Sequence, residues 1–308
     1  MKRTALILAS TALLLSPSLL QAQVKLEHKF PDGRKTTQNK YVKVEQTLTI
    51  AGMEIPSTSE QNVTSSEMNG KRKADGTLES VHKIESLQST IEVAGMKLKF
   101  DSVNADAPPP GTTLDALIDV LKAVAGSSWT VTYGQDNSVL SVTGGEDALK
   151  NLPEALRAAT AKQFSDEHLT NESNQEMRVL PDGPVKQGDS WEREETVFFD
   201  SYQSMTFTTV YKYEGTIEKD GKTLDQISSK TTTVSYAMAG ESPSPLKIVD
   251  SQLKVTDSGG TLLFDRAAGM VIDRKDIKHI SGSLKCEING MELPGKLELT
   301  FEATMNRS

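Results

Sequence analysis

Apolar and polar side chains alternate along most of this chain, and one short phrase around Gly-Met occurs three times. The phrase reads TIAGMEIP from Thr49, EVAGMKLKF from Glu92 and EINGMELPG from Glu287. If the dipeptide that ends in Gly forms a two-residue hairpin loop, the apolar residues around it share one face. A strand that ran straight through would place Ile50 and Met53 on opposite faces. The pattern therefore predicts three β-hairpins, each with one apolar face.

The hairpin interpretation also predicts which residues face each other across the two strands. The expected pairs are Ile50–Met53, Thr49–Glu54 and Leu48–Ile55 around Ala51-Gly52, Val93–Met96, Glu92–Lys97 and Ile91–Leu98 around Ala94-Gly95, and Ile288–Met291 and Cys286–Leu293 around Asn289-Gly290. Cys286 falls on the apolar face, which favours a buried side chain over a reactive thiol. A fourth Gly-Met, in FDRAAGMVIDR, fails the same test because a loop at Ala268-Gly269 would set Phe264 opposite Asp273. A longer turn is expected there.

The same periodicity divides the chain into three segments. Residues 24–105 are predicted to form long antiparallel hairpins separated by Asp-Gly and Asn-Gly turns. ADAPPPG then stops the sheet, because consecutive prolines cannot join a hydrogen-bonded ladder. Residues 112–180 are predicted to be mainly helical, and β-hairpins resume over 184–308.

Within the helical middle, the strongest pattern is that of an amphipathic helix over Thr113–Ala125, with Thr113 as N-cap and Gly126 after its end. WTVTYGQDNSVLSV predicts a further hairpin. Gly145–Gln163 predicts a helix that is interrupted or begins again at Pro153, and Ser165–Leu180 predicts a weaker helix.

These elements predict an α+β fold that is mainly antiparallel β, with curved sheets of long hairpins packed around the helical middle. Strands and helices do not alternate regularly, which argues against a parallel sheet. Residues 23–308 are expected to form a single β-rich domain. The two β halves could build one continuous sheet or two lobes, and we favour one compact unit.

The N-terminus has the pattern of an export signal. Lys2 and Arg3 precede an apolar run, Ala5–Leu15, which is too short to span a bilayer. Polar residues follow the run at once, which favours a signal peptide over residues 1–22 and cleavage after Ala22 rather than a membrane anchor. We therefore expect a periplasmic or extracellular protein with no transmembrane segment in the mature chain.

Charge and composition narrow the partners. The formal net charge is −8, so nucleic acid is a poor partner because an acidic chain releases no counterions from a polyphosphate. One Cys in 308 residues allows no intramolecular disulfide, and aromatic residues make up only 5% of the chain. The fold must therefore depend on a core of aliphatic side chains and Met.

The sequence offers little sign of catalysis. No two of His28, His82, His168 and His279 have the spacing of metal ligands, although a pair could meet in space. GDSWE lacks the second Gly of a nucleophile elbow, and GGEDALK lacks the Gly-Lys-Ser/Thr of a phosphate loop. We predict a non-catalytic protein without metal or cofactor. A pair of carboxylates of the kind that glycosidases use could still hide among the many Asp and Glu residues.

One group of turns resembles a known family. LPDGPVKQGDSWE, from Leu180 to Glu192, together with EKDGKTLDQI and QDNSVLSV, is similar to an uncharacterised family of exported bacterial proteins known only as a domain of unknown function. Its turns have the form Pro-Val-x-x-Gly-Asp-x-Trp. The resemblance implies export and a β-rich fold, and it supplies no catalytic residues. From the residues alone, Trp191 is expected to begin a strand and to pack inward under the adjacent helix.

Three hypotheses for function follow. The first is that curved sheets leave an apolar site for a lipid or another apolar small molecule in the cell envelope, and its candidate ligand-binding residues are Leu117, Leu121, Trp191, Met53, Met96 and Met291. The alternative for the Met residues is that they only complete the core. The second hypothesis is a structural or protein-interaction module of the periplasm or exterior that docks through exposed sheet edges. The third is a hydrolase with a scattered carboxylate site.

Overall fold

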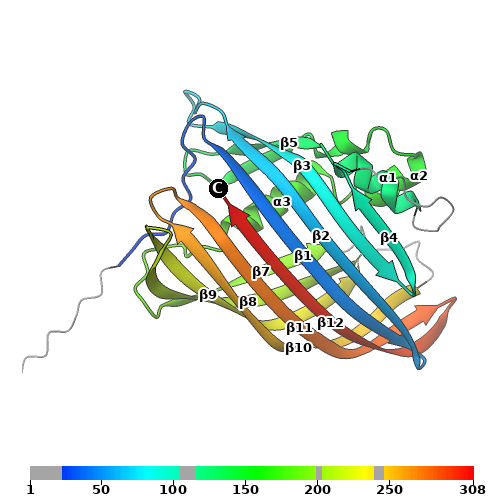
Figure 1. The fold of residues 1–308 in the computed structure, drawn as a ribbon. Helices are drawn as coiled ribbons and strands as arrows, with labels where there is room; N and C mark the ends of the chain where they lie inside the picture. The colour runs from blue at the N-terminus through cyan, green and yellow to red at the C-terminus, as the bar shows by residue number, and fades with distance from the viewer. Residues whose placement is uncertain (1–22, 105–114, 199–202, 239–245) are drawn as a thin grey trace, which may run out of the picture.

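The computed structural model describes residues 23–104, 115–198, 203–238 and 246–308, and within these ranges all strands belong to one antiparallel sheet (Figure 1). The strand order is β6-β5-β3-β2-β1-β12-β11-β10-β9-β8-β7, and β4 pairs with β3. The predicted class, mainly antiparallel β, is confirmed, and of the two arrangements that the sequence left open the β halves form one continuous sheet. The predicted signal peptide lies outside the described residues.

Two groups of long strands flank the helices. The strands are β1 (Lys35–Ile50), β2 (Met53–Asn69), β3 (Leu78–Val93), β4 (Met96–Asp101), β5 (Ser128–Tyr133), β6 (Val139–Thr143), β7 (Ser190–Phe198), β8 (Gln203–Lys219), β9 (Lys222–Met238), β10 (Leu246–Asp265), β11 (Met270–Ile288) and β12 (Met291–Arg307). β1 pairs with β12 from Gln38–Arg307 to Ile50–Gly295. This pairing joins the two β halves into one continuous sheet.

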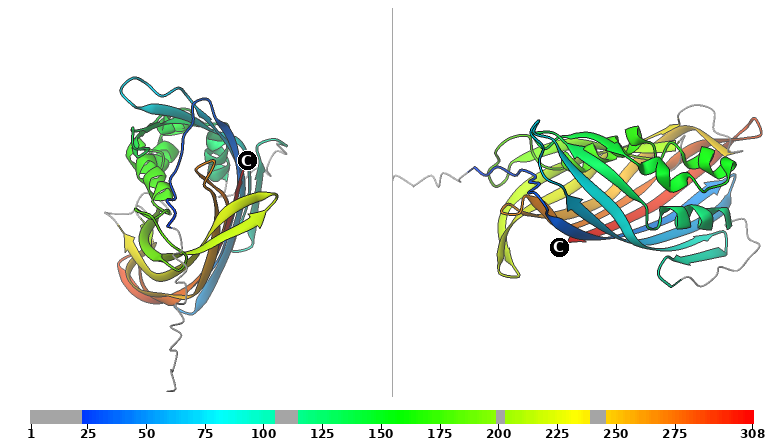
Figure 2. Two further views of the ribbon diagram at one scale, coloured as in Figure 1. Left: turned by 90° about the vertical axis from the view of Figure 1, so that its left-hand side faces the viewer. Right: turned by 90° about the horizontal axis from the view of Figure 1, so that it is seen from above.

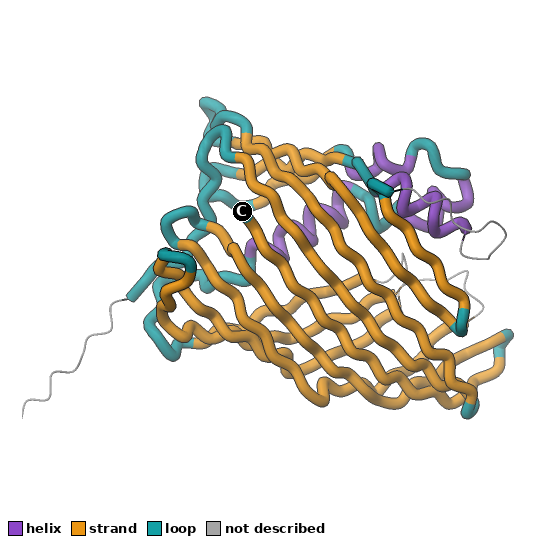
Figure 3. Tube along the Cα trace, viewed as in Figure 1, coloured by secondary structure: helices purple, strands orange, loops and turns teal. Residues whose placement is uncertain are grey.

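The described helices, purple in Figure 3, are confined to the middle of the chain, and their bounds lie close to the predicted ranges. They are α1 (Asp115–Val124), the 3₁₀ turn η1 (Gly145–Leu149), α2 (Glu154–Thr160) and α3 (Asp166–Met177). The α1 helix ends before Gly126, whose φ of 82° is left-handed, and the predicted N-cap Thr113 lies outside the described residues. Pro153 separates η1 from α2, and the Ser165 hydroxyl caps α3 by accepting from the backbone N–H of His168.

The three Gly-Met hairpins are confirmed in register. Every predicted pair is present, including Ile50–Met53, Val93–Met96 and Ile288–Met291. Both residues of each loop have positive φ, as a type I′ turn requires; at the first loop the values are 48° for Ala51 and 85° for Gly52. At the fourth Gly-Met, Asp265 pairs with Met270, so the turn is longer there, as expected.

The sheet bends until strands far apart in its order face each other, as Figure 2 shows. Phe207 on β8 packs in one cluster with Ile280 on β11 and Leu299 on β12. We call the side on which these residues meet the concave face and the opposite side the convex face. Register shifts between β10 and β11 mark three irregularities that favour bending. At Gly282 a Cβ would lie 2.1 Å from the carbonyl oxygen of Gln252, so only glycine allows the close approach of β10 and β11 there.

The α3 helix connects the two terminal strands of the sheet. The Thr170 hydroxyl accepts from the backbone N–H of Val142 on β6 at 2.9 Å, and the Gln175 side chain accepts from the N–H of Thr196 on β7 at 2.5 Å. One backbone N–H on each edge strand is therefore bonded to the same helix, which occupies part of edges that could otherwise pair with another chain.

The two ends of the bent sheet differ. The loops of the three Gly-Met hairpins lie together at one end, at the lower right in Figure 1, which we call the turn end. The opposite end is crossed by residues 24–30: Val24 pairs with Val185, the Lys29 N–H donates to Gly269, and the His28 carbonyl accepts from Asn137. We call this the plug end.

Candidate ligand-binding site

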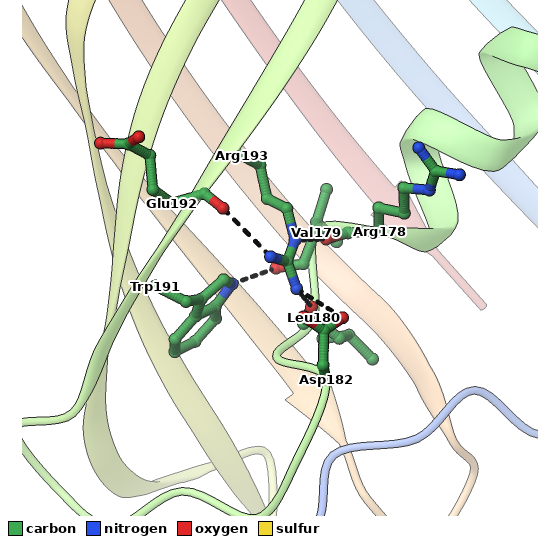
Figure 4. Close-up of polar contacts among 7 residues, drawn as sticks. All are labelled: Arg178, Val179, Leu180, Asp182, Trp191, Glu192 and Arg193. Atoms are coloured by element: carbon green, nitrogen blue, oxygen red, sulfur yellow. Dashed lines mark hydrogen bonds and ion pairs between the residues drawn. The ribbon is translucent and has the colours of Figure 1, made fainter.

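The turn that carries the family resemblance ties α3 to β7 (Figure 4). Trp191, at the start of β7, is partly buried, and its indole N–H donates to the carbonyl of Val179 at 2.9 Å. Its ring stacks on Tyr211 with the centroids 5.9 Å apart. The prediction that Trp191 packs inward beside the adjacent helix agrees with these contacts.

Arg193 makes a second set of contacts to the same turn. Its guanidinium donates to the carbonyls of Arg178 at 2.6 Å and Leu180 at 2.9 Å, and to the Asp182 carboxylate at 2.9 Å (Figure 4). Since the guanidinium is planar and fixed, these contacts set the position of the chain that leaves α3. The motif is therefore a clamp between helix and sheet.

Part of the concave face is left without a full covering layer. On β1 and β12, Ile50, Leu297 and Leu299 point to this face and are buried in the Phe207 cluster. Other apolar side chains of the same face are only partly buried, and we call them the concave strip: Val42, Val44, Leu48, Phe301 and Met305. Val44 and Leu48 pack at the margin of the cluster that contains Phe207. In an isolated antiparallel sheet a half-exposed face would be polar. Here, the apolar side chains of the strip remain partly exposed to solvent.

A lysine lies in the middle of this apolar surface. Lys278 on β11 pairs with Phe301 and is 6% exposed. Its ammonium lies 5.1 Å from the ring centroids of both Phe207 and Phe301. The nearest carboxylate oxygen, on Glu195, is 4.0 Å away, and the Glu195 side chain is 38% exposed. Among the described residues the ammonium has no hydrogen-bonded acceptor, although it can donate three hydrogen bonds.

Charged groups gather at the plug end of the concave face. The Glu67 carboxylate on β2 accepts from Arg307 at 3.1 Å and from Thr36 at 3.2 Å, and His82 lies 3.8 Å away. Arg307 also donates to Gln38 at 2.5 Å. These contacts join β1, β2, β3 and β12 through a single carboxylate.

The electrostatics of this group follow from burial. Burial alone would raise the pKa of the Glu67 carboxyl, but Arg307, His82 and the Thr36 hydroxyl together lower it. Burial, and then Arg307, lower the pKa of His28 to about 4, so its imidazole is neutral near pH 7. The Nε2 atoms of His28 and His82 and the Nε of Arg307 are buried without a partner among the described residues. Such atoms are usually satisfied by internal water.

The structure separates the six candidate residues predicted from the sequence. Leu117 is partly buried and Leu121 is buried, and with α1 both cover Leu87 and Leu98 on the concave face of β3 and β4. Trp191 belongs to a different cluster near the plug end. The six residues therefore do not form one site, and their role in ligand binding stays a prediction.

The Met residues point to the predicted face but are not in the core. Met53, Met96 and Met291 are 70%, 42% and 62% exposed. The alternative that they complete the core is therefore wrong. Met53 is exposed because its end of β2 has no neighbour among the described strands on the β3 side. The pairing of β2 with β3 begins only at Ser57, so Met53 extends past β3.

Sequence reasoning missed Lys278, although the sequence contained a signal. Along β11 the concave positions Ile280, Leu284 and Cys286 are apolar, and Lys278 continues the same alternation with a charge. A lysine at an apolar position of a predicted strand could have been singled out. The polar group around Glu67 gave no such signal, because its members come from distant strands.

Other features limit the chemistry that can be assigned. Among the described residues, no cluster of three or more His, Cys, Asp or Glu side chains could hold a metal ion. Two surface pockets have volumes of about 460 and 420 Å³; the first includes Tyr236 and Ile248, and the second Tyr41 and Ile277.

In the described part of the chain no helix has the length and apolar character needed to cross a membrane. Burial raises the pKa of the Cys286 thiol, which agrees with its predicted core position.

Comparison with known proteins gives a family but no activity. A model described as "Family of unknown function (DUF6263)" matches residues 75–252, more than half of the chain. No curated protein matches.

Solved structures give only distant likenesses. One structure, entitled "Lipid-protein interactions in lipovitellin", is similar at 9% identity and a TM-score of 0.42, over 91% of this chain and 25% of that chain. OccK5 (OpdH) of Pseudomonas aeruginosa is similar at 6% identity and a TM-score of 0.25, over 89% and 98%. An outer membrane channel of Pseudomonas putida F1 is similar at 8% identity and a TM-score of 0.21, over 92% and 98%. This chain spans about a quarter of the lipovitellin chain, and at these scores the likenesses do not inform its function.

Proposed function

The chain belongs to the Family of unknown function (DUF6263), and we propose that it is an exported, non-catalytic protein that binds an apolar or amphiphilic small molecule on the concave face of its sheet. The N-terminal pattern of Lys2, Arg3 and an apolar run supports export to the cell envelope. One observation carries the proposal: the concave strip presents partly buried apolar side chains on the inner side of a bent sheet.

The elements around the concave face favour a small ligand. The α3 helix contacts both sheet edges, and residues 24–30 cross the plug end, so these elements bound the concave face on two sides. Ligand sites are commonly concave, mostly apolar and supplied with a few polar groups. The strip has this composition, with Lys278 and Lys40 as its nearby polar groups.

Binding can be measured with the apolar dye Nile red and by native mass spectrometry of protein purified from its own envelope. We expect dye binding in the wild type and a retained lipid-sized mass. Val44→Gln and Leu48→Gln should each weaken dye binding about tenfold, because each removes apolar contact area. Thr47→Gln is the matched control, because Thr47 lies between them and points to the convex face. If the dye does not bind and every preparation is free of ligand, the proposal is wrong.

The second candidate is an interaction module of the envelope. The exposed Met53, Met96 and Met291 at the turn end favour it, since flexible thioethers adapt to varied partners. The sheet edges are a poorer docking site than the sequence suggested, because α3 already contacts β6 and β7. For this candidate, polar substitutions of the Met residues would abolish a protein complex and leave dye binding unchanged.

A further inference from the structure

We infer that the ligand on the concave face is an amphiphile with an anionic headgroup, a carboxylate or a phosphate, which is received by Lys278. This inference rests on the proposed function and adds the chemical class of the ligand. The position of Lys278 is the first argument. It lies beside Phe301 of the concave strip and pairs with it across β11 and β12.

The second argument is that, in the part of the chain that the structure describes, the Lys278 ammonium has no close hydrogen-bond acceptor. A lysine that is 6% exposed would ordinarily be paired closely and hydrogen-bonded. Here two aromatic faces at 5.1 Å stabilise the ammonium, and Glu195 approaches only to 4.0 Å. Glu195 remains 38% exposed to water, so its carboxylate neutralises Lys278 incompletely. A ligand oxygen that reached hydrogen-bond distance would supply the missing acceptor.

The other charges near Lys278 already have partners. Arg274, four residues along the same face of β11, is paired with Asp276, and Asp276 also accepts from Ser229 at 3.1 Å. Lys40 on β1 is exposed on the concave face, and Glu172 on α3 interacts with it electrostatically. Among the described residues, Lys278 is therefore the cation of this surface that lacks a close acceptor.

The concave strip beside Lys278 offers contacts to an acyl chain. Leu299 and Leu297 on β12 are buried in the Phe207 cluster, so they are not open to a ligand. On β1, Val44, which pairs with Phe301, and Leu48 are only partly buried and continue the strip toward the turn end. At about 3.3 Å per residue, the stretch from Val44 to Leu48 spans roughly 13 Å. A headgroup at Lys278 would leave the first part of an acyl tail along these side chains.

The test compares amphiphiles that share one chain: palmitate, hexadecanol and hexadecyltrimethylammonium, with acetate as the headgroup alone. Affinities are read from displacement of Nile red or by calorimetry. In the wild type, palmitate should bind about tenfold more tightly than hexadecanol, because a charged hydrogen bond forms only with the carboxylate. Lys278→Met should erase this difference and leave hexadecanol binding unchanged. Lys278→Arg should keep most of it, and Lys275→Met, which removes a lysine of the convex face on the same strand, should keep all of it.

The outcomes separate the inference from the proposed function. If palmitate and hexadecanol bind equally, or if the difference survives Lys278→Met, the headgroup inference is wrong and the proposed function stands. Tighter binding of hexadecyltrimethylammonium, or competition by acetate at the same concentration as palmitate, would also overturn it. If no amphiphile binds the wild type, the proposed function itself fails. Folding of Lys278→Met is expected, since replacing a poorly paired buried charge by an apolar side chain is often neutral or stabilising.

Discussion

The plug end and the turn end of the concave face are built from the same strands but are completed in different ways. At the plug end, Arg307 and Thr36 both donate hydrogen bonds to Glu67, and residues 24–30 cross the opening. Toward the turn end, Val44 and Leu48 are only partly buried. Polar contacts and an added segment therefore stabilise one end, while the other end keeps apolar surface exposed. We interpret the first end as structural and the second as the binding end.

The largest expected effect is at Glu67. Glu67→Gln keeps the size of the side chain but leaves the Arg307 guanidinium, 15% exposed, without its carboxylate. Removing one partner of a buried ion pair usually costs about 3 to 5 kcal/mol, and we expect the lower value in the free energy of unfolding. Urea unfolding followed by circular dichroism at neutral pH measures it.

Glu60→Gln is the matched control for this prediction. Glu60 lies on the same strand but points to the convex face, so its removal should change the free energy of unfolding by less than about 0.5 kcal/mol. Equal losses for the two variants would show that the plug end is not held by the Glu67 contacts.

The second prediction concerns acid stability at the plug end. His28 has a pKa of about 4 in the folded chain, against an ordinary value of 6.5, because burial and the charge of Arg307 lower it. Arg34 lowers this pKa further, and Glu176 raises it. Between these values the unfolded chain binds more protons, so the free energy of unfolding falls as the pH falls. The loss from this one group reaches roughly 3 kcal/mol near pH 4.

His28→Phe tests this contribution, because phenylalanine keeps the ring contacts with Phe30 and Phe264. Melting temperatures measured from neutral pH down to about 4 should fall less steeply for the variant than for the wild type. Parallel curves would mean that the pKa of His28 is the same in the folded and the unfolded chain.

The fold was largely predictable because its information is local. The three Gly-Met loops fix their own register, and the alternation around them identifies the apolar face. The pairing of β1 with β12 could not be derived from the sequence, because the paired residues are more than two hundred positions apart. The residue pattern of neither strand identifies the strand with which it pairs. The same limit explains why the sequence left one sheet or two lobes open.

The candidate site was less predictable than the fold. Sequence patterns give the face of a residue but not its depth, so Met53 and Met291 were placed on the correct face and are nonetheless exposed. The meeting of His28 and His82 around Arg307 and Glu176 depends on the bend of the sheet. Bending comes from bulges and close glycine contacts, as at Gly282, which have no periodic signature.

A smaller effect is expected at the clamp that joins α3 to β7. Trp191→Phe keeps an aromatic ring against Tyr211 but leaves the carbonyl of Val179 without its donor. The expected loss is about 1 to 2 kcal/mol in the free energy of unfolding. Trp129→Phe is the control, because the Trp129 indole makes a ring contact with His82 and donates no hydrogen bond among the described residues. A loss for Trp129→Phe as large as that for Trp191→Phe would assign the effect to ring volume.

The smallest effect is expected at the turn end itself. Met53→Ser and Met291→Ser replace side chains that are 70% and 62% exposed, so the free energy of unfolding should change by less than about 0.5 kcal/mol. Met205→Ser, at a methionine that is 5% exposed in the Phe207 cluster, should instead cost about 2 to 5 kcal/mol.

Because the two exposed variants leave stability unchanged, their binding of Nile red reports directly on the predicted ligand role of the Met residues. A weaker affinity would place the path of the ligand across the turn end, next to the hairpin loops. An unchanged affinity would confine the ligand to the concave strip, and the turn end would then be only its margin.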